Sequence, residues 1–395
     1  MQSARNSIQE YQSSVIATVK MKLYLDNAAT TQVDKEVIKI MGDFMANKFG
    51  NPSSLHSFGR EAKEAIELAR SRIAKFINVK SEEIIFTSGG SESNNLAIQG
   101  LAKANPDKKH IITSKIEHPS ILEPLKVLEK QGYKIDYISV DEEGIIDLEE
   151  LKSKIIKNTL LVSIMHVNNE IGTIQPIEEI AALCKGKCFF HTDAVQSFCK
   201  IQIDASSIDL LSASGHKINA SKGIGILYIK QGVKIKPIIN GGSQERDFRS
   251  GTENVPGIVG LAKAVELAEK KDYNKIKDSR DKLVKEILKI KGTRLNGSSS
   301  KRIFNNINIS FQGIEGESLL MKLDKLGIAA STGSACSSHS LKPSHVLLAI
   351  GLKDFDAHGS LRLTLGNPLT DKEINYVVES LNKSVKELRE ISPFK

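Results

Sequence analysis

The sequence contains no apolar run of the roughly 20 residues that a membrane-spanning helix needs, and its first 20 residues lack the apolar core of a secretion signal. It also lacks a localised basic face, since the net charge of +8 is spread along the chain. We therefore expect no membrane contact and no direct nucleic-acid binding, and the surplus of positive charge favours acidic protein partners.

Cysteine is scarce. Four cysteines are too few for a disulfide framework in a chain of 395 residues, namely Cys184, Cys188, Cys199 and Cys336. This scarcity indicates a reducing compartment, and we expect the cytoplasm. Cys184 and Cys188 are spaced as metal ligands on a helix can be, but no Cys or His cluster completes a site. We interpret them as buried thiols and predict no metal.

The chain also has no internal repeat and no low-complexity linker. Short apolar strands instead alternate with amphipathic helices, which predicts an α/β fold with a mostly parallel, doubly wound sheet. A long helical region at 255–290 then leads to a smaller α+β domain. We expect 1–20 to be a disordered extension, 21–34 an N-terminal segment of the small domain, 35–265 the large domain and 266–395 the small domain.

Polar residues follow five of the predicted strands, at 88–91, 117–118, 166–170, 191–196 and 214–217. In a parallel sheet these positions share one edge, where ligands collect. The strand, glycine-rich turn and helix around 88–91 predict an anion cradle made of backbone N–H groups and the hydroxyl of Ser91. The turn matches neither nucleotide fingerprint, because it lacks a Gly-Lys-Ser/Thr ending and a G-x-G-x-x-G pattern.

Lys217 lies in a turn between two apolar stretches that we predict as buried strands, at 208–211 and 223–229. Burial disfavours the ammonium form, so the pKa of this lysine should fall and its amine become nucleophilic. A lysine that forms a Schiff base needs this property. Taken alone, the stretch leaves a surface-turn lysine open as the alternative.

Pyridoxal phosphate requires a set of groups that this edge can supply. Lys217 can bind its aldehyde, Asp193 its ring nitrogen, and the flat ring of His118 can stack on it. Gln196 can donate a hydrogen bond to the ring hydroxyl, and the phosphate can be held by Ser91, Ser214 and His216. Taken singly, Asp193 could be a turn or cap residue and His118 a surface histidine, but their joint placement favours the cofactor.

Cys336 lies among small residues at 330–340, a composition that predicts a mobile, solvated loop. Near such a cofactor, its thiolate could take the sulfur of a bound cysteine as a persulfide. Arg362, on a predicted strand of the small domain, can bind the substrate carboxylate. An incidental cysteine in a flexible loop is the alternative that this window leaves open.

Seven motifs resemble those of the cysteine desulfurases, a group of class V aminotransferase-like pyridoxal-phosphate enzymes. They are YLDNAATT at 24–31, FGNPSS at 49–54, TSGGSESNN at 87–95, HVNNEIG at 166–172, SGHK at 214–217, RSGT at 249–252 and SACSS at 334–338. The resemblance implies the aspartate-aminotransferase-like fold of these enzymes, with a mostly parallel seven-stranded sheet. The SACSS setting is similar to that of the group with a long, mobile catalytic loop.

The resemblance also implies residue roles. Lys217 would bind the cofactor aldehyde, His118 would stack and assist proton transfer, and Cys336 would carry the persulfide. Further cofactor contacts would come from Gly90, Ser91, Asn169, Asp193, Gln196, Ser214, His216 and Thr252. Thr252 would reach the phosphate of the partner subunit in a homodimer. Substrate contacts would come from Asn27, Asn169 and Arg362.

We therefore predict a pyridoxal-phosphate cysteine desulfurase that converts L-cysteine to L-alanine and leaves a persulfide on Cys336. The resemblance implies that the sulfur passes to an iron–sulfur scaffold protein or another acceptor, with tRNA thiolation as a further use. Three alternatives remain: a selenocysteine lyase, an aminotransferase that needs no thiol, and a non-enzymatic sulfur-relay or scaffold-binding protein.

Overall fold

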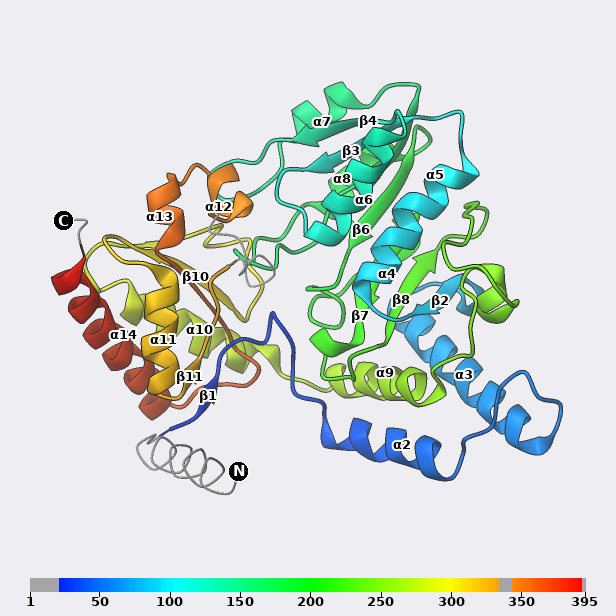
Figure 1. Cartoon of the computed structure of the whole chain (residues 1–395), viewed down its shortest axis with the longest axis horizontal. Coiled ribbons are helices and arrows are strands. Elements are labelled where there is room, and N and C mark those ends of the chain that lie inside the picture. The colour runs from blue at the N-terminus through cyan, green and yellow to red at the C-terminus, as the bar shows by residue number, and fades with distance from the viewer. Residues whose placement is uncertain (1–20, 334–342, 393–395) are drawn as a thin grey trace, which may run out of the picture.

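The computed structural model describes residues 21–333 and 343–392. The predicted extension at 1–20 and Cys336 lie outside the described residues. Two sheets with separate cores lie side by side in Figure 1, the larger on the right and the smaller on the left. The division of the chain at 265/266 remains a prediction.

The larger sheet has seven strands in the order β2-β8-β7-β6-β5-β3-β4. In that order they are Ile84–Thr87, Gly225–Ile229, Leu210–Ser214, Phe189–Asp193, Thr159–Ser163, His110–Ser114 and Lys134–Ile138. All neighbours pair in parallel except β8, which is antiparallel to both β7 and β2. The predicted mostly parallel sheet is therefore confirmed.

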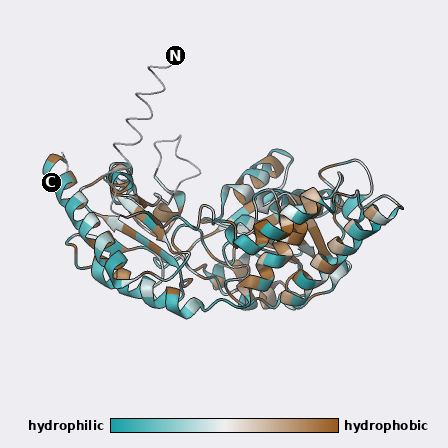
Figure 2. Ribbon diagram, turned by 90° about the horizontal axis from the view of Figure 1, so that it is seen from below, coloured by the Kyte–Doolittle hydropathy of each residue, from teal (hydrophilic) through white to brown (hydrophobic). Residues whose placement is uncertain are grey.

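Amphipathic helices cover this sheet. They are α2 (Lys35–Ala46), α3 (Ser57–Phe76), α4 (Gly90–Asn95), α5 (Leu101–Ala104), α6 (Pro119–Lys130), α7 (Leu148–Lys154), α8 (Ile177–Cys184) and α9 (Val255–Ala268). Between α4 and α5 the helix continues through a π-helical stretch, Leu96–Gly100. Figure 2 shows the apolar strands enclosed by helices whose outer faces are hydrophilic, as burial of one face requires.

The smaller sheet has three antiparallel strands in the order β12-β10-β9, which are Ser360–Thr364, Asn306–Phe311 and Thr293–Leu295. A parallel pair joins β1 (Leu23–Tyr24) to β11 (Ile328–Ala329), so the start of the described chain packs with its C-terminal part. The helices here are α10 (Tyr273–Ile287), α11 (Gly316–Lys325), α12 (His345–Ala349), α13 (Asp354–His358) and α14 (Asp371–Ile391). A capping box of Thr370 and Glu373 begins α14.

The prediction of one helical region at 255–290 is wrong in its middle. The chain leaves α9 at Glu269 and starts α10 after Asp272, whose side chain accepts a hydrogen bond from the Asn274 N–H at 3.1 Å. This local cap competes with continued helix. Helix α9 packs on α2 and α3, whereas α10 packs on α14.

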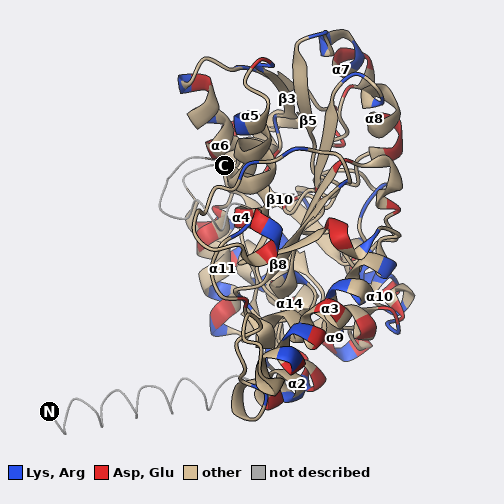
Figure 3. Cartoon of the chain, turned by 90° about the vertical axis from the view of Figure 1, so that its right-hand side faces the viewer, with Lys and Arg blue, Asp and Glu red and all other residues tan. Residues whose placement is uncertain are grey.

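Charges of both signs are mixed over the outer helices in Figure 3, as the sequence pattern indicated. Within residues 21–333 and 343–392, every helix is too short or too polar to span a bilayer.

Candidate active site

A cavity of about 480 Å³ opens at the carboxyl edge of the seven-stranded sheet, within the size range of small-molecule sites. Its walls include nine of the predicted site residues: Gly90, Ser91, His118, Asn169, Asp193, Gln196, Ser214, His216 and Lys217. Arg362 reaches the same cavity from β12 of the smaller sheet. The sheet topology therefore brings together groups that lie up to 272 residues apart in the chain, from Gly90 to Arg362.

Lys217 ends a short 3-10 turn, Gly215–Lys217, between β7 and β8, as the sequence predicted. Its Nζ donates hydrogen bonds to the carbonyls of Ala28 and Ala29, at 2.5 and 2.7 Å. The same N-terminal segment is held by Gln196, whose Nε2 donates to the Ala28 carbonyl at 3.0 Å. The lysine amine is thus fixed at the wall of the cavity by a segment from the start of the chain.

The glycine-rich turn fits closely against the neighbouring strand connection. At Gly90 a Cβ atom would come within 2.6 Å of Val195 Cγ2, so a larger residue would overlap that side chain. Gly89 has a φ of 152°, a backbone conformation that favours glycine. Gly90 and Ser91 line the cavity together with Ser214 and His216, and a Cβ atom at Gly90 would lie 3.6 Å from the Cβ of Ser214. His216 is itself oriented by a contact between its Nδ1 and Thr30 Oγ1 at 3.1 Å.

Asp193 ends β6 with both carboxylate oxygens engaged. Oδ1 accepts the N–H of Val195 at 2.9 Å, and Oδ2 accepts the side-chain amide of Asn94 at 2.7 Å. Asn94 also donates to Ser120 Oγ at 2.8 Å, which links β6 to the start of α6. The sequence analysis missed Asn94, although it lies four residues past Gly90 in the same turn and helix.

His118 is the N-cap of α6, and its Nδ1 lies 2.8 Å from Ser120 Oγ and accepts the Ser120 N–H at 3.1 Å. Burial lowers the pKa of His118, while the nearby Asp193 raises it and Lys217 lowers it further. The net direction is downward, so the imidazole is mainly neutral at pH 7 and able to accept a proton.

Two buried acids at the cavity were not singled out from the sequence. Burial raises the pKa of Glu117 to about 8, because hydrogen bonds from Ser114 Oγ and the Met165 N–H only partly offset desolvation. Among the residues that the structure describes, its Oε2 has no hydrogen-bond partner. Burial also raises the pKa of Glu170. Both acids belonged to the polar stretches that follow strands, but no pattern in the sequence showed that they are buried.

Arg362 reaches across from the smaller sheet. Its Nη1 donates to the Asn169 carbonyl at 3.0 Å and its Nη2 to Asp26 Oδ1 at 2.9 Å, whereas its buried Nε has no partner within residues 21–333 and 343–392. The guanidinium therefore keeps hydrogen-bonding capacity for a carboxylate.

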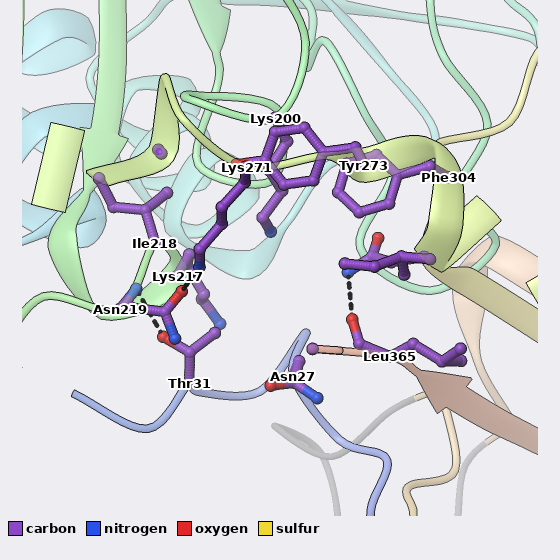
Figure 4. A pocket seen from close by; sticks show the side chains of 14 residues that line it. Asn27, Thr31, Lys200, Lys217, Ile218, Asn219, Lys271, Tyr273, Phe304 and Leu365 are labelled. Carbon is purple, nitrogen blue, oxygen red and sulfur yellow. Dashed lines mark hydrogen bonds between the residues drawn. The ribbon is translucent and has the colours of Figure 1, made fainter. Parts of the chain in front are cut away.

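Asn27 does not line this cavity. It donates to the carbonyl of Thr364 at 2.8 Å and lines a smaller second cavity behind Lys217. Figure 4 shows that Lys200 and Lys271 also line this second cavity, with Lys271 reaching Asn219. Burial and the charge of Lys217 lower the pKa of Lys200 to about 7. Lys217 thus contributes to the walls of both cavities.

Thr252 is exposed and does not line the main cavity of its own chain. Cys336 lies outside the described residues, but the preceding Gly333 lines the cavity.

Residues 23–377 match the aminotransferase class-V family. A cysteine desulfurase IscS from Dictyoglomus turgidum is 52% identical over 95% of this chain and 98% of its own length. This chain belongs to that family, and to its cysteine desulfurase group. Another cysteine desulfurase IscS, from Methanosarcina thermophila, is 50% identical over 96% of this chain and 95% of its own length.

Solved structures agree with this assignment. A NifS-like protein is 39% identical, with a TM-score of 0.88 over 93% of this chain and all of its own. A structure described as SspA in complex with cysteine is 38% identical, with a TM-score of 0.80 over 88% of this chain and all of its own. The predicted fold class, that of the family's pyridoxal-phosphate enzymes, is confirmed.

Members of this family use pyridoxal phosphate, and the cavity fits that group. The close packing at Gly90 keeps an open backbone cradle for a phosphate, and the Asn94 amide fixes the carboxylate of Asp193 for a ring nitrogen. The unpartnered Nε of Arg362 provides a donor for a substrate carboxylate. Donors, carboxylate and amine thus lie around one cavity of sufficient volume.

Proposed function

We propose that the protein is a cysteine desulfurase that converts L-cysteine and the Cys336 thiol into L-alanine and a Cys336 persulfide. The observation that carries this proposal is the shared cavity of Lys217, His118, Asp193 and Arg362, with a cysteine three residues beyond its wall at Gly333. The 52% identity to a protein named as a cysteine desulfurase supports the same reaction.

Pyridoxal phosphate, when bound, supplies an aldehyde for amines and a ring that withdraws electrons from the carbon next to the amine. Lys217 would hold the aldehyde, and Asp193 the ring nitrogen. Gly90, Ser91, Ser214 and His216 would hold the phosphate, Gln196 and Asn169 would contact the ring, and His118 would stack on it. The negative charge of Asp193 favours a protonated ring nitrogen.

The chain's own groups would then act on the substrate. Arg362 orients the carboxylate of L-cysteine through its free N–H capacity. Lys217 and His118 both line the cavity and would take the proton from the α-carbon. The Cys336 thiolate forms the new S–S bond by attacking the substrate sulfur, and the C–S bond electrons stay with carbon, which gains a proton to give alanine.

A homodimer accounts for two further features. Thr252 is exposed and absent from the cavity of its own chain, so it would contact the phosphate of the partner subunit. Phe49, Leu55 and Phe58 form an exposed apolar group before and at the start of α3, with the two phenylalanine rings 5.7 Å apart. A second copy of this chain would bury that group. An iron–sulfur scaffold protein or another acceptor would then receive the sulfur in the cytoplasm.

The test is release of alanine and sulfide from L-cysteine by the reconstituted protein, with a reductant to regenerate the thiol. The wild type should release both, whereas Cys336→Ser and Lys217→Ala should release neither, and Cys188→Ser serves as the matched cysteine control. Full turnover by Cys336→Ser would contradict the persulfide and favour a selenocysteine lyase, to be checked with selenocysteine. Amino-group transfer without sulfide release would indicate an aminotransferase. Protein that binds no cofactor and does not react would indicate a non-enzymatic role.

A further inference from the structure

The second cavity, behind Lys217, lies where the two parts of the chain meet, and its volume is about 30 Å³. Lys200, which follows β6, and Lys271, which follows α9, line it from the part that holds the larger sheet. Asn305, before β10, and Leu365, after β12, line it from the part that holds the smaller sheet. A volume of about 10–15 Å³ already suffices for one water molecule. The cavity therefore suits a single small ion and excludes an organic ligand.

The charged residues of this wall are all positive. The 14 lining residues include Lys200, Lys217 and Lys271 but no Asp or Glu. Figure 4 shows the side chains of Lys200 and Lys271 extending toward Lys217. Burial lowers the pKa of Lys200 to about 7, and the charges of Lys217 and Lys271 add to this shift, which Cys199 alone opposes. The ammonium form of Lys200 therefore lacks a counter-charge here.

Both sides of the cavity keep N–H groups for an acceptor. Among the residues that the structure describes, the amine of Lys200 has no hydrogen-bond acceptor and no carboxylate partner. Lys271 Nζ donates to Asn219 Oδ1 at 2.6 Å, which occupies one of its three N–H groups. On the other side, the amide of Asn305 donates one of its two N–H groups to the Leu365 carbonyl at 3.0 Å. Lys271 is exposed, so the cavity meets solvent beside it.

We propose that this cavity is a halide site, in which one chloride ion binds between the amines of Lys200 and Lys271 and the side-chain amide of Asn305. A halide fits the volume because it is only slightly larger than a water molecule, whereas phosphate and sulfate carry four oxygens around a central atom. Its negative charge offsets the repulsion between the lysines. Lys217 would lose its charge on holding the cofactor aldehyde, so the site depends on the other two lysines.

The first measurement is the melting temperature of the protein reconstituted with pyridoxal phosphate, which occupies the proposed phosphate cradle. Sodium chloride is compared with sodium gluconate at equal ionic strength, since gluconate is too large for the cavity. Chloride should raise the melting temperature of the wild type by about 2 °C or more, because an ion that binds only the folded state stabilises it.

Lys200→Met should abolish this chloride effect. In gluconate the variant should melt above the wild type, because an ammonium without a counter-charge is replaced by an apolar side chain of similar length. Asn305→Ala should weaken chloride binding about tenfold, since the ion loses one hydrogen bond. Lys103→Met, at an exposed lysine of α5, is the matched control and should keep the full chloride effect.

Bromide locates the ion directly. Crystals of the wild type soaked in bromide should show an anomalous peak within hydrogen-bond distance of the amines of Lys200 and Lys271, and crystals of Lys200→Met should not. Sulfate tests an oxyanion in the same place. Because sulfate stabilises proteins in general, the quantity compared is the difference between wild type and Lys200→Met, which should be smaller in sulfate than in chloride.

Three results would overturn the inference: a chloride effect that Lys200→Met retains, a bromide map without a peak in this cavity, or a Lys200-dependent effect of sulfate larger than that of chloride. Protein that binds no cofactor would instead contradict the proposed function, and its response to chloride would still test the halide site. The two failures are therefore distinguishable.

Discussion

The side-chain amide of Asn94 donates a 2.7 Å hydrogen bond to Asp193 Oδ2, so a residue of the glycine-rich turn fixes the carboxylate at the end of β6. With the Val195 N–H on the other oxygen, the carboxylate is held in one orientation at the cavity wall. The glycine-rich turn proposed to hold the phosphate and the carboxylate proposed to meet the ring nitrogen are therefore directly linked.

Asn94→Ala should weaken cofactor binding and turnover by about tenfold, because Asp193 loses a charge-assisted hydrogen bond. Titration of the apoprotein with pyridoxal phosphate measures the first effect, and alanine release at saturating cofactor measures the second. Asn47→Ala is the control. Among the described residues, this exposed asparagine bonds only to Asp43, through the carboxylate and the backbone carbonyl of that residue. An Asn94→Ala variant with wild-type cofactor affinity would show that Asp193 needs no second partner.

Glu117 predicts a pH dependence of stability. Its pKa is about 8 in the folded protein and about 4.5 otherwise, so the folded state retains a proton that the unfolded state loses. The contribution of Glu117 to the free energy of unfolding is fully present below pH 4.5 and is lost as the pH rises to about 8. The free energy of unfolding then falls by up to about 1.4 kcal/mol per pH unit. Urea unfolding from pH 5 to 8 should therefore show a shallower decline for Glu117→Gln than for the wild type.

In the same titration Glu142→Gln, at an exposed position, should follow the wild type. Parallel curves for Glu117→Gln and the wild type would mean that Glu117 ionises normally in the folded protein.

Buried histidines affect stability at the acidic end of the pH range. Burial lowers the pKa of His191 to about 3 and of His166 to about 4, so their contribution to stability is lost as the pH falls below about 6.5.

Arg362→Lys should raise the KM for L-cysteine by about 10- to 100-fold, because a compact ammonium cannot replace the spread, planar donors with which the guanidinium bonds Asp26 and the Asn169 carbonyl and can meet a carboxylate. The kcat should fall less, since the substitution leaves Lys217 and Asp193, the proposed cofactor contacts, unchanged. Steady-state alanine release measures both constants. Arg294→Lys, at an exposed position on β9, is the matched control. An unchanged KM would remove Arg362 from the substrate site.

The buried pair Arg70 and Glu245 predicts a large loss of stability. Arg70 donates to both oxygens of Glu245, at 2.8 and 2.9 Å, and Glu245 also accepts the Phe86 N–H at 2.8 Å. Glu245→Ala should reduce the free energy of unfolding by about 3–5 kcal/mol, because the buried guanidinium loses its buried carboxylate and keeps only the half-exposed Glu67 as a counter-charge. Urea denaturation measures the difference.

Glu67 provides the control on the same guanidinium. It lies 3.2 Å from Arg70 Nε, but its side chain is 46% exposed, so Glu67→Ala should cost at most about 1 kcal/mol. Equal losses of stability in the two variants would contradict the importance of burial at Glu245.

Glu245 is also the first of three successive non-glycine residues with positive φ, 245–247, which precede Thr252 in the chain. Its loss should therefore also disturb the predicted contact with the partner subunit.

Periodicity and turn chemistry were sufficient to predict most elements, because apolar runs mark the buried strands and polar residues follow them at one edge. They could not predict the break between α9 and α10, where a local cap at Asp272 competes with continued helix. The placement of Lys217 between β7 and β8 followed from its flanking apolar strands.

The site was harder to predict wherever a role depends on contacts between distant segments. Asn94, Glu117 and Glu170 act through burial and partners that no local pattern encodes. Asn27 was expected at the substrate but lies in the second cavity, because its amide binds the Thr364 carbonyl across 337 positions of the chain. Local motifs thus identify the chemical groups, and tertiary packing decides which of them face the cavity.

The most direct test is reductive trapping of the cofactor. The protein is reconstituted with pyridoxal phosphate, treated with borohydride and mapped by peptide mass spectrometry, with Lys217→Ala and Lys200→Met as paired variants. Lys200 and Lys271 share the second cavity with Lys217, and the pKa of Lys200 is lowered to about 7, so either amine is a physical competitor. We predict a label on Lys217 in the wild type and in Lys200→Met, and none in Lys217→Ala. A label on Lys200 or Lys271, or no label at all, would contradict the account.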